Sequence, residues 1–568
     1  MNSFNDKEII LRFGVASDVH VSGSWNQPRS KAKLSHAIEV FEKTAELDGA
    51  HLDALLINGD LVDAVNSIGN VSKNNDYGGK LSQNVREISH VADCIYGKEL
   101  GGVGRGIDDK TYLFYSLGNH DESGCGRTGY NPEKAGFPSM HSAAIFTSIF
   151  CGWKCRDFCE GNTEFEDYAR DLMALSESGD GAEKTRFTER YGVDADKALC
   201  LYEKLYGRDI SPSDGDALLY GNRHTVINGI HFAALETSCS DKTCAYLEDI
   251  CRKSVSENPK KPIFAMTHYR VRDTIFESSD GLSNLRPVLE RYPQIVIWAG
   301  HTHTPLFLEN AIWRHGFTCI DSSVGAYLSN SCLIGSHSEV DHPYNLPAKE
   351  SHNFCNGCYV EVDSDYNVRI NRIDLYRSFS CDYARDDIYK GIGIFDGYET
   401  LSLVPSDAGN IAKEAPWVLS NPYLAKTESP VDKPVFIRKP WVLSDFDDVN
   451  AAADNTLPTE PPSFADDAEV SVKAQGDGKI EVEFDSASSD DMVFTYTVRF
   501  KRLSASDDDE VSYTLSTYPH VFKDVSEMPI KQYAVFDGFE EGESYLISIT
   551  ANDICGGESS PLISSFRT

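Results

Sequence analysis

The feature that most constrains the fold of this chain is a series of short apolar runs separated by amphipathic segments, which continues through the first 380 residues. The runs have the composition of buried strands, and the segments between them place apolar residues three and four positions apart, as helices do. The expected strands are residues 9–17, 52–58, 111–117, 230–236, 261–267 and 294–299. The expected helices are residues 30–47, 80–96, 164–176 and 282–292. This alternation predicts an α/β domain in which helices cover the sheets.

Polar side chains follow five of the expected strands, at the point where each strand ends. They are Asp18 and His20, Asp60, Asn119 and His120, His268, and His301 and His303. In a layered α/β domain such strand ends meet at one edge of the sheets, so these groups are expected to converge. Their mixture of oxygen and nitrogen donors is the ligand set of a site for two divalent transition metals. Each element alone has an ordinary structural interpretation as a turn or a hydrogen-bonding side chain, but five in order favour the metal site.

The spacing within these motifs supports the same interpretation. In an extended segment residues i and i+2 share a face, so Asp18 with His20, and His301 with His303, can each project a pair of side chains. A glycine directly precedes three of the expected ligands, and the lack of a Cβ permits the sharp turns and close backbone approach of a crowded site. These glycines are Gly59, Gly118 and Gly300.

The ordered motifs D-x-H, G-D, G-N-H-D, a single His and G-H-x-H resemble those of the calcineurin-like metallophosphoesterase family, from about residue 9 to 376. The resemblance implies a four-layer α/β sandwich of two mixed β-sheets flanked by helices, with both metals at one end. It implies that the first metal is held by Asp18, His20 and His303, and the second by Asn119, His268 and His301. It makes Asp60 the bridge between the two ions.

The same resemblance implies a hydrolase of phosphate esters, either a phosphomonoesterase or a phosphodiesterase, with nucleotides and cyclic nucleotides among the candidate substrates. Two divalent ions, of manganese, iron or zinc, would hold a bridging hydroxide that attacks phosphorus in line. His120 is expected to protonate the leaving oxygen or to stabilise the transition state. Asp121 is expected to orient the His120 ring and to raise its pKa.

Candidate contacts to a small phosphorylated substrate lie beside the expected ligands. Tyr269 and Arg270 directly follow His268, and Arg223 and His224 occur in the segment YGNRHTVINGIHF. Arg270 is the first choice among the four, and each of them has an alternative role as a surface or structural hydrogen-bonding residue.

Two alternative functions remain open at this point. One is a sphingomyelinase-like phospholipid phosphodiesterase, against which Ala64 counts because that branch usually has a His at this position. The other is a binding or scaffold protein with a non-catalytic phosphoesterase domain. A missing metal ligand would favour the scaffold, and none of the expected ligands is missing.

The charge of the chain limits its partners. It has 53 Lys and Arg residues against 88 Asp and Glu residues, for a formal net charge of −35, which argues against broad binding to nucleic acid or to an anionic membrane. No apolar run of about 18 residues occurs, so no transmembrane segment is expected. No export signal is visible, which predicts a cytoplasmic location, with a secreted or cell-surface location as the alternative. The cysteine groups at 151–159 and 355–358 are expected to be buried free thiols or to form an adventitious disulfide, in preference to a structural zinc site.

The chain is expected to have three parts. Residues 1–380 form the phosphoesterase domain, with a helical insert at about 122–229. Residues 381–462 form an extension and linker that packs two Trp-bearing PWVLS turns, at 416–420 and 440–444, onto a neighbour. Residues 463–568 alternate apolar and polar positions and predict an all-β immunoglobulin-like sandwich.

This last part resembles a fibronectin type III domain, in which FTYTVRFKR and YLISITANDICGGESSPL match the central strand and the penultimate strand with its following loop. The resemblance implies a binding or spacing module for a protein or carbohydrate partner.

Overall fold

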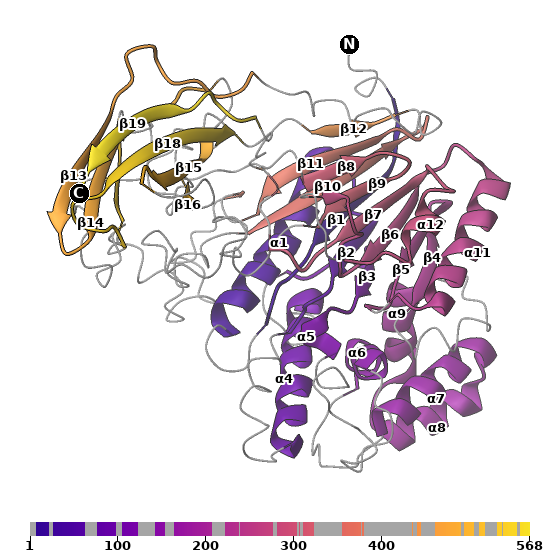
Figure 1. Ribbon diagram of the computed structural model, residues 1–568. Helices are drawn as coiled ribbons and strands as arrows, with labels where there is room; N and C mark the ends of the chain where they lie inside the picture. The colour runs from indigo at the N-terminus through magenta and orange to yellow at the C-terminus, as the bar shows by residue number, and fades with distance from the viewer. Residues whose placement is uncertain are drawn as a thin grey trace.

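The computed structural model describes residues 7–21, 27–62, 77–97, 105–122, 142–153, 164–206, 222–322, 355–379, 434, 440–444 and 460–568, with short breaks inside the ranges that start at 222, 355 and 460. Within these ranges, two six-stranded sheets make up the larger part of the molecule, and two smaller sheets lie beside it (Figure 1).

The first six-stranded sheet is mixed and has the strand order β12-β11-β10-β1-β2-β3. Its strands are β1 (Ile9–Ala16), β2 (Ala54–Asn58), β3 (Tyr112–Ser116), β10 (Asn356–Asp363), β11 (Val368–Asp374) and β12 (Trp441–Leu443). Strands β1, β2 and β3 are parallel, and β10, β11 and β12 extend the sheet in antiparallel pairs. The three parallel strands therefore end at one edge.

The second six-stranded sheet has the order β4-β5-β6-β7-β9-β8. Its strands are β4 (Arg223–Ile227), β5 (Ile230–Ala234), β6 (Ile263–Thr267), β7 (Ile295–Ala299), β8 (Ile312–Arg314) and β9 (Thr318–Asp321). The four central strands are parallel, and the two edge strands, β4 and β8, are antiparallel to their neighbours. This sheet also has one edge at which its parallel strands end.

One hydrophobic cluster joins the facing surfaces of the two sheets. Phe13 of β1 contacts three rings of the second sheet edge to face, with centroid distances of 5.4, 4.8 and 5.6 Å to Phe232, Phe264 and Trp298. Edge-to-face pairs add about 1 kcal/mol each to the free energy of burial. The sheets are therefore fixed face to face, which aligns their carboxyl edges.

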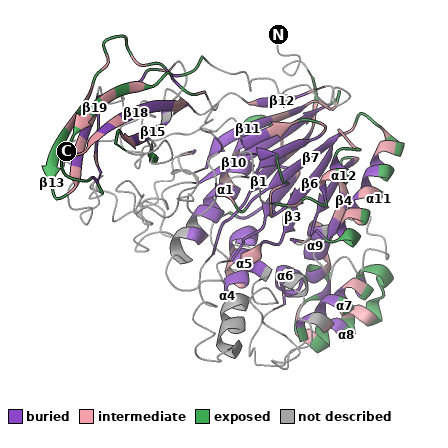
Figure 2. Ribbon diagram, in the orientation of Figure 1, coloured by how far each residue is buried: buried purple, intermediate pink, exposed green. Residues whose placement is uncertain are grey.

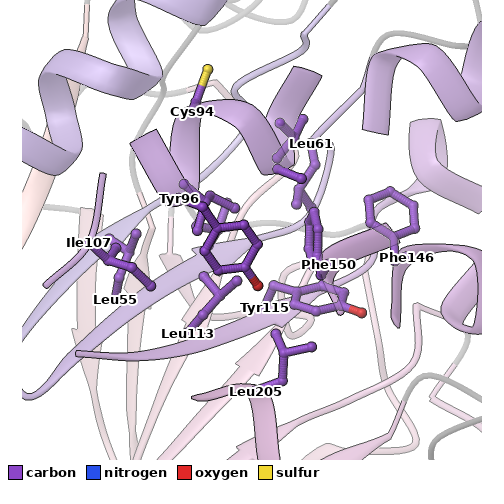
Figure 3. Packing of buried hydrophobic residues seen from close by; sticks show 14 of the residues in the cluster. Leu55, Leu61, Cys94, Tyr96, Ile107, Leu113, Tyr115, Phe146, Phe150 and Leu205 are labelled. Atoms are coloured by element: carbon purple, nitrogen blue, oxygen red, sulfur yellow. The ribbon is translucent and has the colours of Figure 1, made fainter. Parts of the chain in front are cut away.

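Helices cover the outer face of each sheet, giving four layers (Figures 1 and 2). The first sheet is covered by α1 (Gln27–Leu47), α4 (Tyr77–Tyr96), α6 (Ser142–Phe150) and α9 (Ala195–Tyr206). Figure 3 shows Tyr96, Phe150 and Leu205 from three of these helices around Leu113 and Tyr115 of β3. Two further helices, α7 (Glu164–Ser178) and α8 (Gly181–Tyr191), pack against these helices and not against the sheet. The second sheet is covered by α11 (Asp241–Glu257) and α12 (Arg286–Leu289).

The predicted mixed sheets flanked by helices are confirmed, and the six predicted strands are present with bounds that differ by at most two residues. The predicted helix at 282–292 is wrong, because only one turn, α12, forms there. Pro287 lies in the first turn and Pro293 follows closely, and each limits how far a helix can extend. Helix α11 was not predicted, although Ser240 caps it by accepting the N–H of Thr243 at 3.3 Å.

The C-terminal strands form two antiparallel sheets, β13-β14-β17 and β16-β15-β18-β19. Their bounds are β13 (Val470–Gly476), β14 (Lys479–Asp485), β15 (Val493–Arg502), β16 (Glu510–Ser516), β17 (Lys531–Phe536), β18 (Ser544–Asp553) and β19 (Leu562–Arg567). Residues of both sheets share one hydrophobic cluster, in which the rings of Phe500 and Phe536 are 4.9 Å apart. This cluster has no residue in common with the clusters of the six-stranded sheets.

Part of the predicted extension belongs to the first sheet. The second PWVLS copy contains β12, whose Trp441 is buried, while the copy at 416–420 lies outside the described residues. Cys151, Cys355 and Cys358 are buried free thiols, as predicted, and the other two cysteines of the first group are outside the described residues. No helix within the described ranges is long and apolar enough to cross a membrane.

Candidate metal centre

The predicted ligands lie just beyond the carboxyl ends of parallel strands from both sheets. In the first sheet, Asp18, Asp60 and Asn119 follow β1, β2 and β3. Asn58 at the end of β2 pairs with Ser116 at the end of β3, and Ala16 at the end of β1 pairs with Ile57, one residue before the end of β2. In the second sheet, His268 and His301 follow β6 and β7, and Thr267 at the end of β6 pairs with Ala299 at the end of β7. Since the two sheets pack face to face, these strand ends meet at one place.

The backbone is strained where it presents the ligands. Five of the predicted ligands have a positive φ, although none of them is glycine. They are Asp18 (52°), His20 (43°), Asp60 (46°), His301 (73°) and His303 (53°). The left-handed conformation costs roughly 1–2 kcal/mol at a residue that carries a Cβ. Such strain is typical of functional sites, where the surrounding structure holds it in place.

Glycines make room for these close approaches. A Cβ on Gly118 would overlap the carboxylate and backbone nitrogen of Asp60, and a Cβ on Gly59, whose φ is +74°, would overlap the ring of His268. Gly300 is crowded in the same way. The predicted need for glycine ahead of the ligands is confirmed at these three positions.

The first group of donors consists of Asp18, His20, Asp60 and His303, all of them buried. The Nε2 atoms of His20 and His303 are 3.0 Å apart, and Nε2 of His303 is 3.2 Å from Oδ1 of Asp18. Nε2 of His20 is 3.7 Å from Oδ2 of Asp60. Ligand atoms about 2.1 Å from one ion lie roughly 3 Å or more from one another, so this spacing fits a divalent cation.

The second group consists of Asp60, His268 and His301, with Asn119 beside it. Nε2 of His268 is 3.1 Å from Oδ2 of Asp60 and 3.1 Å from Oδ1 of Asn119. The rings of His268 and His301 have centroids 5.3 Å apart. Asp60 belongs to both groups, and the division into two groups is the one that the family resemblance implied.

A buried hydrogen-bond network supports His268, and it was not predicted from the sequence. Nδ1 of His268 lies 3.3 Å from the carbonyl oxygen of Asn58, which turns Nε2 toward the other donors. The Asn58 side chain accepts from Ser116 at 2.6 Å and donates to the Thr267 carbonyl at 3.1 Å and to Ser322 at 2.5 Å. Asn58 thus ties the ends of both sheets together. The one available signal was its position ahead of the G-D motif.

His120 lies beside the bridging position. Its ring is perpendicular to that of His20 at a centroid distance of 4.5 Å, and its Nε2 is 3.9 Å from Oδ2 of Asp60. Its backbone N–H donates to Oδ1 of Asp60 at 2.8 Å. The ring is partly exposed, so it can reach a bound molecule while its backbone is held in place.

Asp121, the residue after His120, is buried. Its two carboxylate oxygens accept the backbone N–H groups of Val62 at 3.0 Å and Gly118 at 2.8 Å. Burial and the charge of Asp60 raise the pKa of Asp121 to about 7. These contacts join the G-D and G-N-H-D segments, and the predicted action of Asp121 on the His120 ring stays a prediction.

The electrostatics favour ionised carboxylates among the donors. Burial by itself would raise the pKa of Asp60, but His268, His20 and His120 hold it well below its usual range. Burial likewise acts against a charged His268, yet the Asp60 carboxylate raises its pKa to about 9. Burial and the neighbouring His268 lower the pKa of His301 to about 4. A divalent cation would replace the imidazolium proton as the partner of Asp60.

The four predicted substrate contacts lie in different places in the structure. The Tyr269 ring packs on His301 at a centroid distance of 4.7 Å, and Arg270 is the next residue. Arg223 is buried, with its guanidinium carbon 3.4 Å from the centroid of the Tyr115 ring.

His224 contacts His231, which in turn contacts Glu257. Its Nε2 lies 2.9 Å from Nδ1 of His231, and Nε2 of His231 lies 3.1 Å from Glu257 at the end of α11. Burial lowers the pKa of His224 to about 4. Its contacts therefore connect it to the helix that covers the second sheet.

Carboxylate and imidazole donors, most of them buried, at the carboxyl edge of a four-layer α/β fold are typical of a metal-binding site. A family model described as calcineurin-like phosphoesterase matches residues 11–305, which is just over half of the chain. The chain therefore belongs to the calcineurin-like phosphoesterase family, whose members are in general metal-dependent phosphoester hydrolases.

Two of the solved structures that resemble part of the chain each cover about a fifth of it. The fn3 domain of the human collagen alpha-1(XX) chain is 12% identical, with a TM-score of 0.15, over 21% of this chain and 90% of that one. The chicken CNTN1 FN1-FN3 domains are 19% identical, with a TM-score of 0.14, over 20% of this chain and 31% of that one. At these TM-scores the likeness establishes no fold. No curated protein sequence matches the chain.

Proposed function

We propose that this protein hydrolyses phosphate esters with two divalent metal ions, one in each group of donors. The observation that carries the proposal is that two groups of donors, in which only His301 is exposed, share Asp60 and, with Asn119 beside His268, contain the full ligand set of the family motifs. Asp18, His20 and His303 would hold the first ion, and Asn119, His268 and His301 the second. The mixture of oxygen and imidazole donors suits manganese, iron or zinc.

When bound, such ions supply positive charge for the phosphoryl oxygens and lower the pKa of water. The residues of the chain then have separate tasks. Asp60 stays ionised between the two groups because three imidazoles hold its pKa low. His120 is held by its N–H bond to Asp60 and has an accessible ring, which suits it to donate a proton to the leaving oxygen.

We further propose that the substrate is a small phosphorylated molecule. Tyr269 lies against His301 and presents a half-buried ring at the second group, where it could pack on the organic part of a substrate. Arg270 beside it is the candidate cation for a phosphate oxygen. Nucleotides and cyclic nucleotides are the proposed substrates to test first.

The experiment combines metal analysis with a substrate panel. We expect the purified full-length chain, loaded with Mn²⁺, Zn²⁺ or Fe²⁺, to contain two ions and to hydrolyse p-nitrophenyl phosphate, bis(p-nitrophenyl) phosphate or a cyclic nucleotide. Cleavage of sphingomyelin in preference to these would favour the phospholipid alternative. Folded protein that contains no metal would favour the scaffold alternative, and metal-loaded protein that hydrolyses none of the panel would contradict the proposal.

For the C-terminal part, we propose an immunoglobulin-like sandwich of the fibronectin type III kind that binds a protein or carbohydrate partner. Its two antiparallel sheets share a core of their own, which supports a separate domain. We propose its start near residue 463, after the extension and linker at 381–462.

A further inference from the structure

Two hydrogen bonds hold the chain next to His301 and His303 in place. Thr302, which lies between the two histidines, donates its hydroxyl to Oδ2 of Asp321 at 2.5 Å. Leu306, three residues after His303, accepts from Nη1 of Arg372 at 3.1 Å through its carbonyl oxygen. The positive φ of both histidines shows that the loop that carries them needs support, because each strained residue costs about 1 kcal/mol or more.

Arg372 is an unusual residue to find in this position. It lies in β11 opposite Cys358 of β10, and it is only 1% exposed. A buried guanidinium costs several kcal/mol unless charge and hydrogen bonds compensate it. Burial raises the pKa of the Cys358 thiol to about 12, with Arg372 lowering it and Asp321 raising it, so both charges lie close to this thiol.

Trp441 closes over Arg372 from the edge of the sheet. The guanidinium carbon lies 4.0 Å from the centroid of the Trp441 ring, and Trp441 is fully buried. Trp441 pairs with Ile370, two residues from Arg372 on the same face of β11. A desolvated cation is attracted to the negative face of a Trp ring, so the ring helps to fix the direction of the guanidinium toward Leu306.

We propose that Arg372 and Trp441 are positioning residues that hold the metal-binding loop from behind. Both residues lie beyond residue 305, where the family match ends. Strand β12 of the extension is therefore part of the support of the site and not a passive linker. This inference rests on the proposed metal centre.

The alternative is that Arg372 and Trp441 contribute to stability alone. The two roles separate by measurement, because loss of core packing lowers the free energy of unfolding while loss of loop support weakens metal binding. Partners that orient metal ligands typically change metal affinity by about 10- to 100-fold when they are removed. Metal affinity is therefore the informative readout.

The test uses the full-length chain, four substitutions and the rescue variant Arg372→Lys. Arg372→Met removes the donor at similar length, and Trp441→Leu removes the ring but keeps an apolar side chain. Leu443→Ala is one control, because it empties a buried position on the same strand, β12. Trp313→Leu is the second control, because Trp313 lies in the other sheet and also has an arginine over its ring. This arginine, Arg286, lies 5.4 Å from the ring centroid and donates to the backbone carbonyls of Arg272 and Asp273, not to Leu306.

Mn²⁺ affinity is measured by calorimetry at a temperature where circular dichroism shows each variant folded. We expect Arg372→Met and Trp441→Leu to bind one ion roughly tenfold or more weakly, and Leu443→Ala and Trp313→Leu to bind as the wild type does, whatever their stability. Arg372→Lys should recover part of the affinity by restoring a charged donor.

Two results would overturn the inference. If the wild type binds Mn²⁺ and both positioning variants bind it equally well, the support role is wrong while the metal centre stands. If the controls weaken binding as much as the positioning variants do, the effect is general destabilisation. Wild-type protein that binds no Mn²⁺, Zn²⁺ or Fe²⁺ would contradict the proposed function itself.

Discussion

At the scale of single residues, Asp60 joins the two groups of donors. Its Oδ2 atom lies 3.1 Å from Nε2 of His268 and 3.7 Å from Nε2 of His20, and its Oδ1 accepts the N–H of His120. The carboxylate therefore faces both groups and the candidate proton donor at once. A neutral side chain of the same size could keep the shape but not the charge.

The change Asp60→Asn should remove metal and activity together. We expect metal content to fall by at least one ion per chain and hydrolysis to slow by about 100-fold or more, since metal ions supply several kcal/mol of transition-state stabilisation. Mass spectrometric metal analysis and steady-state kinetics check this. The matched control is Asp53→Asn at the opposite end of β2, where Asp53 accepts the N–H of Arg12. Full metal content in Asp60→Asn would contradict the bridging role.

His120 should separate chemistry from metal binding. For His120→Gln we expect hydrolysis to slow by roughly 10²- to 10⁴-fold, the usual contribution of a general acid, with metal content unchanged. His90→Gln on α4, where His90 contacts Lys31, serves as the control and should keep full activity. If His120→Gln loses metal in proportion to activity, the residue acts on the ions and not on the leaving group.

At the scale of elements, α1 is fixed to the first sheet through a buried histidine. Nε2 of His36 donates to the carbonyl of Ser378, just after β11, at 3.0 Å. Burial lowers the pKa of His36 to about 4, against an ordinary value of 6.5. The ring is therefore neutral in the folded protein at pH values where it would gain a proton in the unfolded chain.

Stability should consequently fall as the pH drops through this window. Below about pH 6.5 the unfolded chain binds a proton that folded His36 does not, so the stabilisation present above pH 6.5 is lost progressively toward pH 4. The loss should be about 2 kcal/mol at pH 5 relative to pH 7. Urea unfolding should show a smaller acid-induced loss in His36→Gln, while the exposed control His51→Gln behaves as the wild type. Equal losses in all three proteins would show that His36 does not titrate in this range.

At the scale of the whole molecule, the four-layer part and the C-terminal part have separate hydrophobic cores. The donors, the network around Asn58 and the support from Arg372 all belong to the four-layer part. Strand β12 belongs to it as well, although the 66 residues from 375 to 440 separate the end of β11 from the start of β12. The four-layer part therefore extends at least to β12.

Truncation tests where the functional part of the chain ends. A chain that ends at residue 459 keeps β12, and we expect it to retain metal content and hydrolysis within about twofold, because domains with their own core fold separately. A chain that ends at residue 433 lacks Trp441 and should bind metal more weakly. Equal metal affinity in the two truncated chains would argue against a role for β12, and loss of activity at 459 would show that the C-terminal part contributes to the site.

Much of the architecture could be predicted because its signals are local. A run such as residues 54–57 is apolar throughout since it is buried on both faces, so its composition alone indicates a strand. Elements whose signals are weak were missed, among them the short strands β8 and β9 and the capped helix α11. The sequence indicated β12 only as part of a repeated PWVLS segment. A strand of three residues is too short for its hydrophobic pattern to predict which strand it pairs with.

The sequence by itself determined which residues stand at the strand ends and in which order, because donor chemistry and strand composition are properties of short segments. The tertiary structure decided what these residues meet. It brought Nε2 of His20 within 3.0 Å of Nε2 of His303, which is 283 positions away, and it set five predicted ligands in a strained backbone conformation. It also placed Arg372 between the Leu306 carbonyl and the ring of Trp441. Such contacts depend on how two sheets pack face to face, and no single segment of the sequence contains that information.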